Sequence, residues 1–88
     1  MSDEETVRLW LVERDYNDKG LVTLAYATTD GERVVRQHRS ETMLSRKPVT
    51  AAIDVDADRP EPTEESLVDR YASEASRVAD RNDPDDSV

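Results

Sequence analysis

The sequence predicts a single α+β domain, built from a three-stranded antiparallel meander, a fourth strand and one long amphipathic C-terminal helix packed on the sheet. Three observations lead to this fold class. Apolar residues alternate with polar ones through two consecutive segments between residues 6 and 28, which is the period of half-buried strands. Turn sequences, Asn17-Asp18-Lys19-Gly20 and Asp30-Gly31, follow those segments. Apolar residues recur at helical spacing between residues 67 and 79.

The first strand is expected from Thr6 to Asp15. Val7, Leu9 and Leu11 share one face, and Trp10, Val12 and two arginines share the other. The second strand, about 21–28, has apolar residues on both faces, which is typical of a central strand. The third run, 33–38, contains two adjacent valines, so alternation does not assign its inward face.

The remaining elements follow from capping and periodicity. Ser40 can cap a short helical turn over 41–46, and residues 49–56 alternate as a fourth strand whose pairing stays open. Thr63 is the expected N-cap of the helix 64–81, because Glu64 and Glu65 then lie where the helix dipole favours acids. We expect a mobile acidic lead over 1–5, one domain over 6–82 and a disordered acidic tail over 83–88.

Composition limits the classes of function. The chain has 88 residues, which suffice for one core, and no cysteine, which excludes disulfides and thiol chemistry. Its net charge of −9 argues against general affinity for nucleic acids or anionic membranes. No apolar stretch is long enough to span a membrane, and the acidic start is unlike a signal peptide, so we expect a cytoplasmic protein.

The acidic and basic residues are unevenly chosen. Asp outnumbers Glu twelve to nine, and Arg outnumbers Lys ten to two. This composition resembles that of proteins from salt-loving archaea, and within that group the chain resembles small acidic proteins with no assigned role. The resemblance implies a cell interior at molar salt, where a Debye length of about 3 Å screens most of the self-repulsion. It implies no catalytic motif.

An apolar surface is the first candidate site. One helix cannot cover both faces of the predicted sheet, and Trp10, Val12 and Tyr26 are the residues expected on the face left open. An exposed apolar face of this kind favours a protein interface, most simply a homodimer. The first hypothesis is therefore a protein-interaction module that self-associates through a sheet face. The alternative for Trp10 is a partly covered face on which arginine stems pack over the ring.

A basic island between residues 33 and 47 is the second candidate site. Residues 31–50 carry two acids and five bases, a net charge of +3 within an acidic chain. The alternative hypothesis is binding of nucleic acid or an anionic ligand, through Arg33, Arg36, His38, Arg39, Arg46 and Lys47. Internal neutralisation of the chain's own acids is the competing interpretation. No aromatic residue interleaves with these bases to stack on nucleotides.

We predict no metal site, no cofactor and no enzymatic activity. Asp54, Asp56 and Asp58 have the spacing that opens a calcium-binding loop, but Arg59 stands where such a loop needs glycine. A solvated acidic strand end is the preferred interpretation. The chain has only two glycines, both in expected turns, so it has no phosphate-binding loop, and it lacks the other common catalytic motifs.

Overall fold

The computed structural model describes residues 5–40 and 49–88, and its first three strands form the predicted antiparallel meander. The strands are β1 (Thr6–Tyr16), β2 (Leu21–Ala27) and β3 (Arg33–Ser40). Gly20 and Gly31 lie in the two turns with φ of 78° and 75°, a backbone conformation that glycine adopts without steric cost. Tyr26 of β2 lies opposite Leu11 on one side and Val35 on the other, so β2 is the central strand of the meander, as expected.

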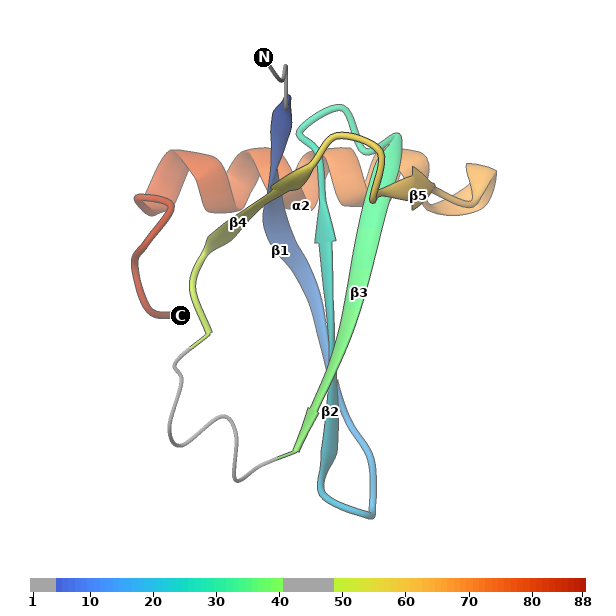
Figure 1. Ribbon diagram of the computed structural model, residues 1–88, viewed down its shortest axis with the longest axis vertical. Helices are drawn as coiled ribbons and strands as arrows, with labels where there is room; N and C mark the ends of the chain where they lie inside the picture. Colours follow the sequence, from blue (N-terminus) through green and yellow to red (C-terminus); the bar gives the residue numbers. More distant parts are fainter. Residues whose placement is uncertain (1–4, 41–48) are drawn as a thin grey trace.

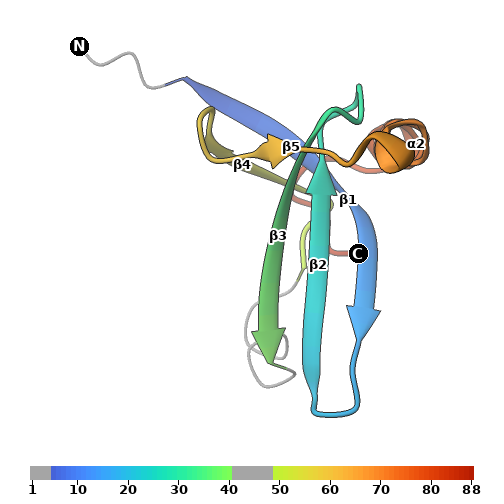
Figure 2. The same ribbon diagram turned by 90° about the vertical axis from the view of Figure 1, so that its right-hand side faces the viewer.

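Two further strands extend the sheet at its edges. The predicted fourth strand is β4 (Ala52–Asp56), which pairs antiparallel with β1. The fifth, β5 (Glu61–Pro62), pairs with the start of β3 and was not predicted, since a two-residue strand leaves no periodicity. The order is β4-β1-β2-β3-β5. β4 and β5 lie at opposite edges of the sheet, yet only residues 57–60 join them. The sheet is therefore curled, so that its two edges come close together on one side of the meander (Figures 1 and 2).

The C-terminal helix packs on one face of the sheet, as predicted. A 3₁₀ turn (Glu65–Leu67) leads into α2 (Val68–Arg81), which crosses the strands on the side away from β4 and β5 (Figure 2). Gly31 lies tight against this helix: a Cβ built there would come 2.1 Å from the Val68 carbonyl oxygen. Thr63 does not cap the helix, contrary to the prediction, because the turn begins after Glu64 and the buried Thr63 hydroxyl has no hydrogen-bond partner among the described residues.

Each face of the sheet carries a buried apolar cluster, although the sequence led us to expect one open apolar face. Trp10, Ala51, Ala52 and Ala75 pack together between the sheet and α2. The opposite face holds a second cluster, made of Leu9, Val22, Leu24, Tyr26, Val35, Val49 and Val55. The curl explains the difference, because β4 and the residue Val49 before it close over the face that the helix leaves free.

The last residues are hydrogen-bonded, so the predicted disorder of 83–88 is wrong. Thr50 forms an antiparallel bridge with Ser87, and the Val88 amide donates to the Val49 carbonyl at 2.9 Å. The Arg14 guanidinium donates to the Val88 carbonyl at 3.0 Å. Low hydrophobicity made this segment look unstructured, but backbone pairing along a strand edge does not require apolar side chains. The predicted short helix over 41–46 lies outside the described residues.

Candidate functional site

The predicted partner surface does not exist as an exposed patch. Trp10 is 9% exposed beneath α2, and Val12 packs partly buried against the same helix. Tyr26 is fully buried on the opposite face, so it cannot share a surface with Trp10. The prediction of a partner surface at Trp10, Val12 and Tyr26 is therefore wrong. Its premise, that the helix would lie on the other face, failed because Trp10 anchors the helix itself.

The Tyr26 hydroxyl is an unusual feature of this core. It is buried and has no hydrogen-bond partner within the part of the chain that the structure describes. Burial raises the pKa of the phenol, while the charges of Arg39 and Arg14 act in the opposite direction. A buried polar group without a partner costs stability, and its burial means that this hydroxyl is not part of an exposed binding surface.

The basic residues of β3 are divided between its two faces. Residues directly opposite on paired strands share a face. Arg39 pairs with Val22, so it lies on the face of the Tyr26 cluster, and its guanidinium donates to the Gln37 side chain at 2.8 Å. Arg36 pairs with Ala25 and lies on the helix side. The described part of the island is thus no single patch, and Arg46 and Lys47 lie outside the described residues.

The remaining two bases of the prediction have local partners. The Arg33 guanidinium donates to the Ala57 carbonyl at 3.0 Å, at the far end of β3 from Arg39. His38 lies opposite Thr23, and its Nδ1 is 3.1 Å from the threonine hydroxyl. His38 and Arg36 are both exposed on the helix side of the sheet, where α2 no longer covers it.

A hydrogen-bonded link joins the sheet to the helix at the point along the strands where α2 stops covering the sheet. The Tyr71 hydroxyl of α2 donates to a Glu13 carboxylate oxygen at 2.7 Å and accepts from the Arg36 guanidinium at 3.3 Å. Burial, followed by the hydrogen bond to Glu13, raises the pKa of Tyr71, and Arg36 opposes this rise. The sequence did not reveal this link, because a bulge at Val12 reverses the strand parity and turns Glu13, not Arg14, toward the helix side.

A shallow groove of about 280 Å³ extends from this link over the open part of the sheet. It is lined by residues from three strands and the start of the helix, namely Glu13, Asp15, Thr23, Ala25, Arg36, Leu67, Arg70 and Tyr71. Acids from β1 lie at one side and bases from β3 and α2 at the other, so the groove offers partners to both signs of charge. No sequence motif indicates it, since its residues come from four separate segments.

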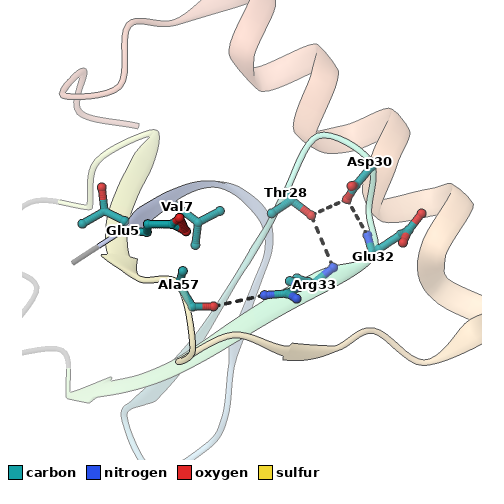
Figure 3. A pocket seen from close by; sticks show the side chains of 8 residues that line it. Glu5, Val7, Thr28, Asp30, Glu32, Arg33 and Ala57 are labelled. Carbon is teal, nitrogen blue, oxygen red and sulfur yellow. Dashed lines mark hydrogen bonds between the residues drawn. The ribbon is translucent and has the colours of Figure 1, made fainter. Parts of the chain in front are cut away.

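A second pocket, of about 500 Å³, lies where the β2–β3 turn meets the start of β1 and the end of β4 (Figure 3). Its side chains are largely occupied with holding the turns. The Asp30 carboxylate accepts from the Thr28 hydroxyl and from the Glu32 amide, and these bonds lower the pKa of Asp30. Arg33 is held by Ala57. The pocket is therefore best explained as a consequence of turn geometry.

The acidic run near β4 forms an ion pair. The Asp54 carboxylate accepts from the Arg8 guanidinium at 2.9 and 3.2 Å, and the bond to Arg8 lowers the pKa of Asp54. Both side chains are about half exposed, so the pair contributes little to stability. Within the described residues, no group of three or more acids or histidines is placed to hold a metal ion.

Comparison with known proteins gives one family. A model described as "Family of unknown function (DUF7967)" matches residues 3–88. The chain belongs to this family. No curated protein and no solved structure matches the chain. Among the described residues, none of the helices has the length and apolar character needed to cross a membrane.

Proposed function

We propose that this chain is a non-catalytic interaction module that recognises an acidic protein segment through strand β3. The observation that carries the proposal is the charge of this strand. β3 reads RVVRQHRS, with three arginines, one histidine and no acid, in a chain with a net charge of −9. Beyond Val34, where its pairing with β5 ends, it forms the margin of the described sheet, and Arg36 and His38 are exposed there. A local excess of one charge at an accessible margin favours a partner of the opposite charge.

An acidic protein segment fits this strand better than a nucleic acid does. The arginines of β3 point to both faces of the sheet, whereas phosphates of one nucleic acid strand need a continuous basic track. The tyrosine rings near Arg36 and Arg39 in the described structure, Tyr71 and Tyr26, are buried and therefore cannot stack on bases. The absence from the sequence of the common catalytic motifs supports a binding role over a catalytic one.

Fluorescence anisotropy with two labelled probes of equal charge tests the proposal. One probe is a Glu-rich peptide of about ten residues and the other is a single-stranded oligonucleotide, each titrated with protein at about 0.15 M salt. We expect binding of the peptide, and we expect Arg36→Glu combined with Arg39→Glu to abolish it. The matched control, Arg77→Glu with Arg81→Glu, makes the same charge change on exposed positions of α2 and should leave binding intact.

Other outcomes contradict the proposal in distinct ways. Preferential binding of the oligonucleotide would replace it with the nucleic-acid hypothesis. Equal loss of peptide binding in both double variants would show that overall charge, not β3, governs the affinity. The predicted homodimer stays a prediction without an assigned surface, and light scattering behind a sizing column at molar salt tests it directly.

A further inference from the structure

The backbone of β3 presents hydrogen-bonding groups at the outer edge of the sheet. Residues of an antiparallel strand direct their amide and carbonyl groups alternately to the two neighbouring strands. The Thr28 amide donates to the Arg33 carbonyl at 3.1 Å, so odd-numbered residues of β3 face β2. The Thr63 amide donates to the Glu32 carbonyl at 2.9 Å on the opposite side. The backbone groups of Arg36 and His38 therefore point outward.

Among the described residues, the strand that pairs with the outer edge of β3 lies at its beginning. β5 pairs with Arg33 and Val34, and beyond them no described residue pairs with β3 on that side. At the other margin of the sheet, residues 49–52 leading into β4 exchange backbone hydrogen bonds with the segment 84–88: the Ala51 and Ala52 amides donate to it, and the Val49 carbonyl accepts from it. Unpaired strand edges template the addition of another strand, and within the described structure the edge of β3 around Arg36 and His38 has no paired strand beside it.

We propose that the edge of β3 around Arg36 and His38 accepts an extended acidic segment of a partner protein as an added strand. This inference rests on the function proposed above and specifies its geometry. Strand addition of this kind draws affinity from backbone hydrogen bonds and selectivity from the side chains that alternate above and below the sheet.

The divided placement of the bases supports an added strand. Side chains of an added strand would point alternately to the two faces. Residues on the helix side would then lie beside Arg36 and His38, and residues on the other side would lie beside Arg39. An acidic segment can thus pair with bases on both faces, which a flat anionic surface cannot do.

A second copy of β3 is a poor occupant of this edge. Antiparallel pairing of two β3 edges around a two-fold axis would set Arg36 and His38 of one copy against the same residues of the other. Like charges directly opposite on neighbouring strands are destabilising. Charge complementarity therefore selects an acidic strand over self-pairing.

Backbone-blocked peptides test the added strand without altering the protein. The probe is the Glu-rich peptide described above, compared with a peptide of identical sequence that is N-methylated at alternate residues in either register. N-methylation removes the amide donors and leaves the charge unchanged. Because only alternate amides of an added strand face β3, we expect the peptide whose methylated amides face β3 to bind at least about tenfold more weakly than the peptide methylated in the other register, which corresponds to the loss of one or two hydrogen bonds.

A protein variant tests the same contact from the other side. His38→Pro removes an outward amide at a position where an edge strand tolerates proline, whereas His38→Ala removes the same side chain and keeps the amide. We expect His38→Pro to weaken peptide binding at least about tenfold more than His38→Ala does, because both variants lose the imidazole and only the proline variant also loses the amide. The melting temperature of each variant verifies folding. If His38→Pro does not fold, protection of the Arg36 and His38 amides from hydrogen exchange in the peptide complex of the unmodified chain decides the question.

The failures of the two proposals are distinguishable. If the plain peptide binds, loses affinity in Arg36→Glu with Arg39→Glu, and yet tolerates N-methylation equally well in both registers, then the interaction module stands and the added strand is overturned. If the peptide does not bind at all, the proposed function fails and the added strand fails with it. Protection of the two amides together with sensitivity to methylation is the result that supports both.

Discussion

The helix-side face of the meander has two regions that differ in cover and in composition. Beneath α2, the row that crosses the three strands is Trp10, Ala27 and Val34. In the open region, the corresponding row is Asp15, Thr23 and His38. The first row is buried and the second is not. Figure 1 shows the β1–β2 hairpin reaching well beyond the helix. The side chains on this face therefore change from apolar to polar at the point along the strands where α2 no longer covers them.

The two regions together show how a small domain can combine a hydrophobic core with an open surface. The same strands run through both regions, so their covered halves fix the position of their open halves. The Glu13–Tyr71–Arg36 link lies at the boundary and ties the helix to both flanking strands of the meander. A partner that docks on the open half of β3 would thus meet a strand that is already rigidly placed, which reduces the entropic cost of binding.

The largest effect is expected from removing the anchor of the covered region. Trp10→Ala should lower the free energy of unfolding by about 3–5 kcal/mol, because a buried aromatic side chain leaves a cavity. Asp15→Ala, on the same strand in the open region, should change it by no more than about 0.5 kcal/mol. Urea unfolding monitored by circular dichroism measures both. Similar losses in the two variants would contradict the division of the face.

The two glycines offer a matched pair for a second test. Gly20 and Gly31 have nearly the same positive φ, but Gly31 lies against the α2 backbone, whereas Gly20 is in the projecting hairpin (Figure 1). Both alanine variants incur backbone strain of about 1 kcal/mol or more. Gly31→Ala should cost about 1–3 kcal/mol beyond that, because the helix must shift. Equal urea midpoints for the two variants would show that the helix does not press on this turn.

Sequence periodicity predicted the main strands and the helix of this fold well, but it did not predict how they pack and pair in three dimensions. The alternation in β1 and β2 and the stripe that includes Tyr71 and Ala75 identify elements, because one face of each must be buried. The face of the sheet on which the helix lies depends on contacts such as Trp10 with Ala75, which no local pattern contains. β5 and the pairing of Ser87 with Thr50 arise from backbone hydrogen bonds alone, so the side-chain pattern has no trace of them.

The candidate site was predicted only in its charge. The excess of bases in β3 is visible in the sequence, but the division of Arg36 and Arg39 between the two faces requires the register with β2. The bulge at Val12 is a clearer case. Simple alternation places Arg14 on the helix side, whereas the observed register places Glu13 there, opposite Ala25. One extra residue in a strand reverses every later side chain.

The smallest of these effects concerns the boundary between the two regions. Tyr71→Phe removes the hydroxyl that bonds Glu13 and Arg36, and both of these side chains can regain water. The free energy of unfolding should fall by only about 1–2 kcal/mol at neutral pH. Urea unfolding at pH 7 measures this loss, and Glu13→Gln, which keeps an oxygen acceptor for the phenol, is the milder control.

The pH dependence of the same variant separates the hydroxyl from general packing. Burial and the bond to Glu13 raise the pKa of Tyr71 above its unfolded value of about 10. The protonated phenol therefore contributes stability that is fully present below pH 10 and is lost as pH rises through the raised pKa. Unmodified protein should lose more stability between pH 9 and about pH 11 than Tyr71→Phe does. Some alkaline loss remains in the variant, because burial also raises the pKa of Tyr26. Parallel curves for the two proteins over this range would show that the Tyr71 phenol is as easily ionised in the folded chain as in the unfolded one.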